Sequence, residues 1–140
     1  MKNGIGKKKI SLELFTGAGG LALGIHGAGF NHVGVVEYDK DSCDTLRLNN
    51  NKSVNTSTSW PVFEADVRNF DYSMYSSLEL DLLAGGAPCQ PFSLGGKHKG
   101  HLDSRNMFPE VFRAVRELCP KAILLENVRG LTRTSFFPYF

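Results

Sequence analysis

The chain contains few cysteines, and their spacing argues against the metal and disulfide frameworks of cysteine-rich domains. Cys43, Cys89 and Cys119 are the only three, and no two of them form a Cys-x-x-Cys pair. Disulfide scaffolds and structural zinc sites use paired cysteines at short spacings. We therefore expect neither a disulfide framework nor a metal site, and a reducing cytoplasm is the simplest location.

Long hydrophobic runs and a strong net charge are also missing. No apolar stretch approaches the roughly 20 residues that a membrane-spanning helix needs, and the basic residues 1–9 are not followed by the apolar core of a signal peptide. The formal net charge of +2 is too small to indicate nucleic-acid binding by itself. With 140 residues, 41% hydrophobic and 21% charged, the composition is typical of one soluble globular domain.

Short apolar runs alternate with helical patterns along the chain. In the helix predicted over residues 41–49, we expect Cys43, Leu46 and Leu48 to face inward. The alternation predicts an α/β fold with a doubly wound, mostly parallel sheet. Strands are expected over residues 10–15, 33–38, 62–65, 80–84 and 122–125, and helices over 21–28, 41–49 and 108–118.

Side chains with useful chemistry fall at or just after the ends of these predicted strands. They are Phe15, Glu37, Asp66, Cys89 and Glu126. In a doubly wound sheet, the ligand binds beyond the carboxyl ends of the strands. The sequence therefore predicts one site at that edge.

Residues 15–20, Phe-Thr-Gly-Ala-Gly-Gly, form a loop in which the backbone can approach a ligand closely, because glycine lacks a Cβ. The loop lacks the Gly-Lys-Ser/Thr of a phosphate loop, which argues against nucleoside triphosphate hydrolysis. Glu37 follows 17 residues after Gly20, near the place where an acid meets ribose hydroxyls in dinucleotide folds. A solvated strand-end charge is the alternative for Glu37.

Two more residues near strand ends have alternative interpretations. Tyr38 could stack on an adenine ring, or it could be an ordinary core or surface aromatic residue. Asp66 could accept a hydrogen bond from an adenine amino group, or it could cap a helix.

Cys89 follows an apolar run that ends in two glycines, and prolines stand at positions 88 and 91. A loop at the end of a parallel strand presents a nucleophile well, and the prolines restrict the backbone that holds the sulfur. The alternative is a small, buried and inert cysteine, which is the commoner state of a free cysteine.

Glu126, Asn127 and Val128 follow the last predicted strand. This places a carboxylate at the end of a buried strand, then an amide, then a turn. A partly buried carboxyl group can have a raised pKa and can donate a proton. The alternative is a strand-end charge that pairs with Arg129.

In this order, the segments resemble the N-terminal part of a DNA cytosine methyltransferase, the family that modifies carbon 5 of cytosine and uses S-adenosyl-L-methionine. The resemblance extends from about residue 10 to residue 131, and the cysteine and Glu-Asn-Val segments are its most specific parts. Thr16 and Ala87 depart mildly from the family pattern, in which serine and proline are common. The matching segments are 15–21, 37–39, 66–67, 85–93, 103–106 and 126–128.

The resemblance implies catalytic roles for three residues. Cys89 would attack carbon 6 of a cytosine flipped out of double-stranded DNA, and Glu126 would hold and protonate ring nitrogen 3. Asn127 would orient Glu126 or the Cys89 loop. Base flipping fits this chemistry, because the target atoms are inaccessible in a stacked duplex.

The resemblance also implies two sets of binding residues. The expected contacts with double-stranded DNA are Gln90, Ser93 and Arg105. The expected contacts with S-adenosyl-L-methionine are Phe15, Thr16, Gly17, Ala18, Gly19, Gly20, Leu21, Glu37, Tyr38, Asp66, Val67 and Pro88.

Later parts of the family pattern have no counterpart in this sequence. It lacks the Gln-x-Arg-x-Arg segment, the target-recognition region and the C-terminal helix beside the cofactor site, and it ends on the apolar residues 136–140. We therefore expect a basic extension over residues 1–9 and a partial methyltransferase domain over residues 10–140. Its Rossmann-like fold would be incomplete at the C-terminus.

Three functions remain open at this point. The first is a methyltransferase fragment, or one subunit of a split enzyme, in a prokaryotic restriction-modification system; a complementing subunit would carry the target-recognition region. The second is a non-enzymatic remnant that keeps the fold and binds the cofactor or a partner. The third is a nicotinamide-dependent oxidoreductase, in which the Pro-Cys-Gln loop would have no role.

Overall fold

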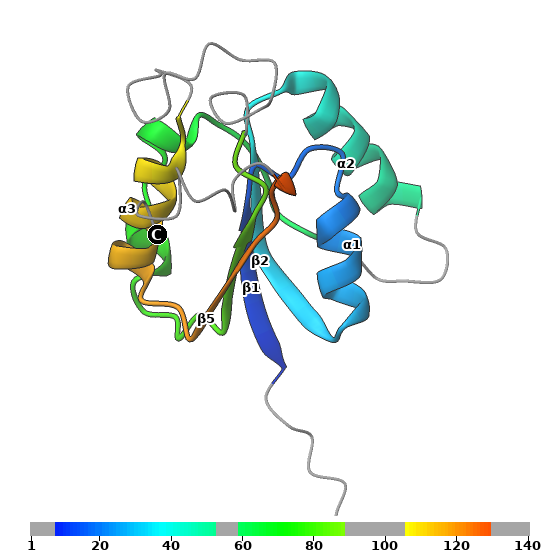
Figure 1. Ribbon diagram of the computed structural model, residues 1–140. Coiled ribbons are helices and arrows are strands. Elements are labelled where there is room, and N and C mark those ends of the chain that lie inside the picture. The colour runs from blue at the N-terminus through cyan, green and yellow to red at the C-terminus, as the bar shows by residue number, and fades with distance from the viewer. Residues whose placement is uncertain (1–7, 53–58, 89–105, 130–140) are drawn as a thin grey trace, which may run out of the picture.

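Five parallel strands form one sheet in the computed structural model, which describes residues 8–52, 59–88 and 106–129 (Figure 1). Their order in the sheet is β3-β2-β1-β4-β5. The chain therefore builds outward from β1 in one direction, returns, and builds in the other, as in a doubly wound sheet. The strands are β1 (Lys9–Leu14), β2 (Phe30–Glu37), β3 (Val62–Glu64), β4 (Leu82–Gly85) and β5 (Ala122–Leu125).

Helices cover both faces of this sheet (Figure 1). The helices α1 (Gly20–Gly27) and α2 (Lys40–Lys52) lie on one face. The helix α3 (Phe108–Leu118) lies on the other, together with two short 3₁₀ helices, η1 (Val67–Asn69) and η2 (Ser73–Tyr75). The predicted fold class is confirmed, whereas the two 3₁₀ helices were not predicted.

The start of β2 lies three residues before the predicted position, because a polar side chain is buried there. The His32 ring is 2% exposed, with Nδ1 3.1 Å from Ser11 Oγ and Nε2 2.9 Å from the Ala22 carbonyl oxygen. Desolvation lowers the pKa of His32, so the ring is neutral near pH 7. A histidine whose two nitrogens are both hydrogen-bonded can sit inside a sheet, although its polarity hides the strand in the sequence.

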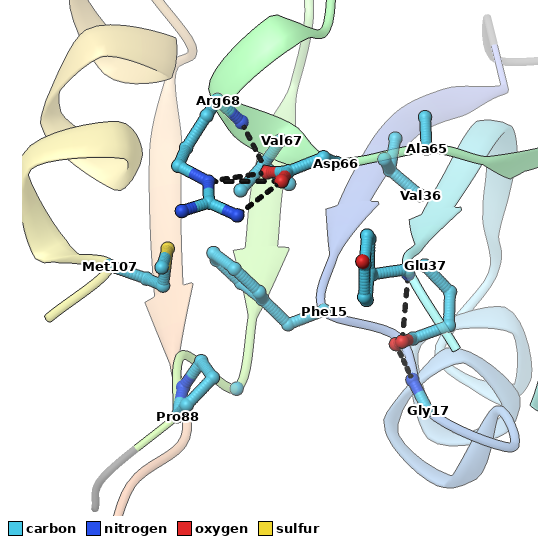
Figure 2. A pocket seen from close by; sticks show the side chains of 12 residues that line it. Phe15, Gly17, Val36, Glu37, Ala65, Asp66, Val67, Arg68, Pro88 and Met107 are labelled. Carbon is cyan, nitrogen blue, oxygen red and sulfur yellow. Dashed lines mark hydrogen bonds and ion pairs between the residues drawn. The ribbon is translucent and has the colours of Figure 1, made fainter. Parts of the chain in front are cut away.

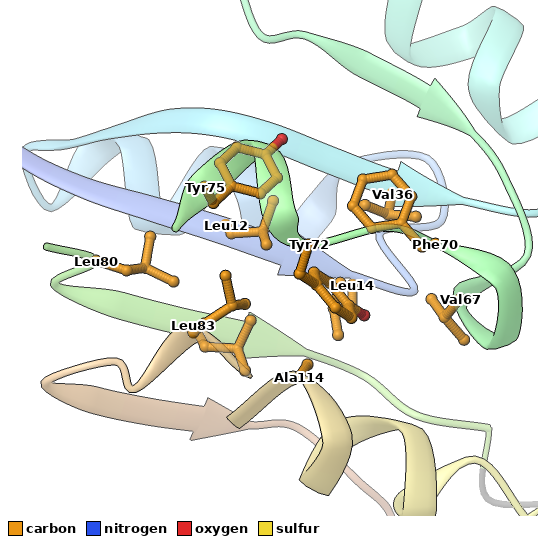
Figure 3. Packing of buried hydrophobic residues seen from close by; sticks show 11 residues of the cluster. Leu12, Leu14, Val36, Val67, Phe70, Tyr72, Tyr75, Leu80, Leu83 and Ala114 are labelled. Carbon is orange, nitrogen blue, oxygen red and sulfur yellow. The ribbon is translucent and has the colours of Figure 1, made fainter. Parts of the chain in front are cut away.

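The main core lies between the sheet and α3, and it includes the segments around η1 and η2 (Figure 3). A second cluster, on the α1 and α2 face, contains Leu46 and Trp60. The prediction for Cys43 and Leu46 is confirmed, but that for Leu48 is wrong, since its side chain is 52% exposed. Leu48 lies about 200° around the helix from Leu46, which turns it to solvent. The buried residues of the main cluster are Leu12, Leu14, Val36, Val67, Phe70, Tyr72, Tyr75, Leu80, Leu83, Ala114 and Leu118.

The strand before Glu126 is exposed, which corrects the prediction of a buried strand. All four residues of β5 are exposed, and Ile123 retains 48% of its accessible surface. The reason is position: β5 is the last strand in the sheet order, and within the described ranges it pairs only with β4. None of the described helices is long and apolar enough to cross a membrane.

A carboxyl group is buried in the middle of β1. Glu13 is 1% exposed, and its neighbours across the sheet are Val35 and Ala84. Its Oε2 atom has no hydrogen-bond partner among the described residues. Burial raises the pKa of Glu13 to about 8, so the group is protonated and uncharged at neutral pH.

The buried Glu13 makes stability depend on pH in a predictable direction. The unfolded chain releases this proton near the ordinary pKa of 4.5, whereas the native state keeps it to about 8. The native state therefore binds more protons in this window, and its free energy of unfolding falls as pH rises, by at most about 1.4 kcal/mol per pH unit from this group. Glu13→Gln removes the titration. Urea unfolding at pH 5, 6.5 and 8 should show that the free energy of unfolding of the variant rises relative to that of the wild type as pH rises. A difference between the two free energies that stays constant with pH would contradict the raised pKa of Glu13.

Candidate active site

A cavity of about 340 Å³ opens at the carboxyl ends of the strands, at the edge that the sequence predicted (Figure 2). Its walls come from the ends of β1, β2, β3 and β4 and from the residue before α3. Figure 2 shows Met107 on the α3 side and Glu37 on the β2 side, with Phe15 between them. The lining residues are Phe15, Gly17, Val36, Glu37, Tyr38, Ala65, Asp66, Val67, Arg68, Gly86, Pro88 and Met107.

The glycine loop turns the chain from β1 into α1 through left-handed backbone conformations. Phe15, Gly17 and Gly19 have φ values of 55°, 56° and 96°. Gly19 is the N-cap of α1, and a Cβ there would lie 2.7 Å from Leu46 Cδ2. Glycine at this position therefore satisfies both the backbone angle and the close packing against α2.

Glu37 joins the glycine loop to the turn that follows β2. Its Oε2 accepts a hydrogen bond of 2.7 Å from Gly17 N, and its Oε1 accepts bonds of 2.8 Å from Tyr38 N and Asp39 N. The alternative of a merely solvated strand-end charge does not describe this residue. An ionised carboxylate has about four acceptor positions, so roughly one remains for a ligand hydroxyl.

Asp66 caps a helix and lines the cavity at the same time. Its Oδ1 accepts a hydrogen bond of 3.0 Å from Arg68 N at the start of η1, and its carboxylate also binds the Arg68 guanidinium, with Nε 2.9 Å from Oδ2. The Arg68 side chain, through these hydrogen bonds, lowers the pKa of Asp66. The capping alternative is thus what the structure shows, and the carboxylate remains at the cavity wall (Figure 2).

Tyr38 lies at the cavity without belonging to the core. Its side chain is 73% exposed, and it lines both the main cavity and a neighbouring polar depression formed with Asp39, Lys40 and Glu64. An aromatic ring that is both exposed and beside a cavity offers a face on which a planar ligand can stack.

The Glu-Asn-Val segment lies against the chain that leads to Cys89. Asn127 Nδ2 donates a hydrogen bond of 2.9 Å to the Ala87 carbonyl oxygen. Glu126 N donates to the Gly85 carbonyl oxygen at 3.0 Å, and Glu126 Oε2 lies 3.3 Å from the position that a Cβ on Gly86 would take. The exposed Glu126 carboxylate therefore borders Gly86, a residue of the cavity wall.

Four of the predicted site residues lie outside the described part of the chain: Cys89, Gln90, Ser93 and Arg105. Pro88, directly before Cys89, is described and lines the cavity. Five predicted cofactor contacts are not part of the lining: Thr16, Ala18, Gly19, Gly20 and Leu21. Thr16 is buried instead, with Oγ1 3.4 Å from both the Glu13 and the Val36 carbonyl oxygens, and Leu21 packs against the cluster of Ile25, Leu82 and Ala84.

Sequence reasoning missed five lining residues: Val36, Ala65, Arg68, Gly86 and Met107. Val36, Ala65 and Gly86 lie at or just after strand ends. They could have been predicted from the expectation that a ligand binds at the carboxyl ends of the strands. Arg68 and Met107 reach the cavity only because η1 and the start of α3 fold over the sheet, and no local pattern signals that.

Known proteins with sequences like this chain are DNA methyltransferases. The family model for the C-5 cytosine-specific DNA methylase matches residues 10–137. The type II methyltransferase M.NgoMIV of Neisseria gonorrhoeae is 50% identical over 129 residues, which cover 92% of this chain and 38% of M.NgoMIV. The type II methyltransferase M.AquIA of Picosynechococcus is 43% identical over 136 residues, covering 92% of this chain and 52% of M.AquIA.

Solved structures show the same fold. A prophage-encoded protein of Escherichia coli, described as a DNA modification methyltransferase, superposes with a TM-score of 0.70 at 30% identity, covering 91% of this chain and 34% of its own. The chain thus spans about half or less of the length of these relatives. The match to the family model covers most of the sequence, and the chain belongs to the C-5 cytosine-specific DNA methylase family.

Proposed function

We propose that this chain is the cofactor-binding and catalytic part of a DNA cytosine carbon-5 methyltransferase, acting as a fragment or as one subunit of a split enzyme. One observation carries the proposal. A single cavity is lined by seven of the twelve predicted cofactor residues, among them Pro88 directly before Cys89, and Glu126 lies against its wall at Gly86. Two sets of residues that are distant in the sequence therefore meet at one edge of the sheet.

The cavity fits the cofactor that the family implies. Its volume falls within the range of small-molecule sites. Glu37 keeps an acceptor position for ribose hydroxyls, Phe15 and Tyr38 offer aromatic surface, and Asp66 offers a carboxylate that an adenine amino group would share with Arg68. When bound, S-adenosyl-L-methionine would supply an electrophilic methyl group.

The chain's own residues would perform the remaining chemistry. In the proposed mechanism, the Cys89 thiolate bonds to carbon 6 of the flipped cytosine while Glu126 protonates nitrogen 3, which makes the ring electrophilic. Carbon 5 then becomes nucleophilic and takes the methyl group. A water molecule would then take the proton from carbon 5, the bond between sulfur and carbon 6 would break to release the Cys89 thiolate, and nitrogen 3 would return its proton to Glu126.

Asn127 would support this mechanism through its contact with the chain before Cys89. Its bond to the Ala87 carbonyl oxygen ties the strand end before Cys89 to the segment that carries Glu126. We infer that Asn127 orients the Cys89 loop, which was one of the two roles expected for it. Gln90, Ser93 and Arg105 would contact double-stranded DNA, and the rest of the enzyme would supply sequence recognition.

The exposure of Glu126 favours a second candidate. A catalytic acid works best when water is excluded around it, and Glu126 and the whole of β5 are exposed in the described part of the chain. A remnant that keeps the fold and binds the cofactor without catalysis would look the same. Activity with a complementing polypeptide distinguishes the two candidates.

Cofactor binding can be tested by calorimetry with S-adenosylhomocysteine. Glu37→Gln and Asp66→Asn should each weaken binding by about tenfold, because a charge-assisted hydrogen bond is worth roughly 1.5–3 kcal/mol. Asp71→Asn is the matched control, since Asp71 also accepts a backbone hydrogen bond, from Ser73 N, but does not line the cavity. Equal binding by all four proteins would refute the site.

The purified chain alone should transfer little or no methyl to DNA, because the family's arginine segment and recognition region have no counterpart in the sequence and their phosphate and base contacts are absent. The assay measures the transfer of tritiated methyl groups from S-adenosyl-L-methionine to mixed-sequence DNA. Adding the remaining segment of M.NgoMIV as a separate polypeptide should raise the rate. Turnover of about 1 per second or faster by the chain alone would contradict the prediction.

In such a complemented enzyme, Cys89→Ser should abolish turnover and leave cofactor binding nearly intact, because a hydroxyl is a far weaker nucleophile than a thiolate. Glu126→Gln should cut the rate by roughly a hundred- to ten-thousand-fold.

DNA containing 5-fluorocytosine should trap a covalent adduct on Cys89 in the same complemented enzyme, and mass spectrometry locates the modified residue. Cys119→Ser, at an exposed cysteine on α3's C-cap, is the control; an adduct there or on Cys43 would overturn the mechanism.

A further inference from the structure

Arg113 lies on α3, outside the cavity lining, yet its guanidinium binds the segment that carries Asp66. Its Nη2 donates a hydrogen bond of 2.5 Å to the Val67 carbonyl oxygen, and its Nη1 donates one of 3.3 Å to the Phe70 carbonyl oxygen. Both carbonyls belong to the turn around η1, whose N-cap is Asp66. One side chain of α3 therefore holds the beginning and the end of this turn.

The guanidinium is itself held in place on its other sides. Glu110 Oε2 accepts a hydrogen bond of 2.8 Å from Nε, and Glu117 Oε1 accepts one of 3.0 Å from Nη1. The guanidinium carbon lies 4.8 Å from the centre of the Tyr72 ring, and the side chain is only 27% exposed. Two carboxylates and an aromatic ring therefore fix the orientation of the planar guanidinium, so that its remaining N–H groups point at the two carbonyl oxygens.

The turn around η1 depends on such support, because it is not part of the sheet. Among the described residues, the bond of 2.8 Å from Ala65 N to the Glu37 carbonyl oxygen is the last one between this segment and β2. Beyond it, the turn has the local bonds from Asn69 N to the Asp66 carbonyl oxygen and from Phe70 N to the Val67 carbonyl oxygen, of 3.0 and 3.3 Å. A short 3₁₀ turn with few bonds of its own takes its position from its neighbours.

The start of the same helix also lines the cavity. Met107 is the N-cap residue of α3 and lines the cavity, as do Asp66, Val67 and Arg68 on the η1 side. Arg113 thus bonds the helix that begins after Met107 to the backbone of the η1 turn.

We propose that Arg113 is a positioning residue of this site: it fixes the η1 turn, and with it the Asp66 carboxylate, relative to α3. The consequence for ligand selectivity rests on the proposed function, in which Asp66 accepts the adenine amino group. Misplacing the turn then weakens recognition of that amino group more than it weakens binding of the rest of the ligand.

The test compares Arg113→Lys with Arg116→Lys in the 140-residue chain. Lysine keeps the positive charge but cannot reach two carbonyls with a planar fork. Arg116 is an exposed arginine of the same helix and does not bond to η1 in the described part of the chain, so it is the matched control. Glu110→Gln is a second, milder variant that leaves Arg113 in place but removes one of its carboxylate partners.

Two measurements are made on each protein. Amide hydrogen exchange at Asn69 and Phe70 reports on the turn without any ligand, and Arg113→Lys should speed it by about tenfold, with a smaller change in the same direction for Glu110→Gln. Calorimetry with S-adenosylhomocysteine and its 6-oxo analogue S-inosylhomocysteine gives the preference for the amino group. That preference should fall by at least about threefold in Arg113→Lys, which corresponds to part of one hydrogen bond, and should not change in Arg116→Lys.

The possible results separate the inference from the proposed function. Exchange at Asn69 and Phe70 that is the same in both lysine variants would overturn the inference, and so would an equal loss of affinity for both ligands, which a purely structural role predicts. Faster exchange in Arg113→Lys, with no binding of S-adenosylhomocysteine by the wild type, would support the positioning role and contradict the proposed function.

Discussion

The Glu37 carboxylate accepts hydrogen bonds from the backbone amides of Gly17, Tyr38 and Asp39, and the shape of the cavity depends on it. Parallel pairing brings the ends of β1 and β2 side by side, but their following loops leave in different directions, one into α1 and one into α2. One carboxylate at the end of β2 satisfies donors from both loops. The carboxylate therefore holds the ends of β1 and β2 together as one wall of the cavity, with the Phe15 side chain beside it (Figure 2).

The other wall has a different physical basis. The η1 turn leaves the sheet after Ala65, and the main core below it packs Val67, Phe70 and Tyr72 against β1 and α3 (Figure 3). Hydrophobic burial of this kind fixes the turn only loosely, because it has no direction. The Arg113 guanidinium adds directed bonds to two of its carbonyls. One wall is thus organised by an anion that accepts from amides and the other by a cation that donates to carbonyls.

The elements with clear periodicity could be predicted from the sequence, and the residues that reach across between elements could not. The bounds of α3 and β5 agree with the apolar pattern, whereas β2 begins earlier because the buried His32 looks polar. Phe15, Glu37 and Asp66 could be placed at one edge because parallel strands end together. The roles of Arg68, Met107 and Arg113 depend on the tertiary position of η1 and α3, and the exposure of Glu126 depends on β5 being the last of the described strands in the sheet order.

A nuclear magnetic resonance titration of the chain with S-adenosylhomocysteine tests the central claim most directly, namely that the cavity at the strand ends is the cofactor site. The amide signals of Gly17, Tyr38 and Arg68 should shift together with one dissociation constant, because these residues line the same cavity. The amide signals of Met74 and Leu78, which do not line it, should stay in place. Shifts confined to residues away from the cavity, or no shifts at saturating ligand, would contradict the account.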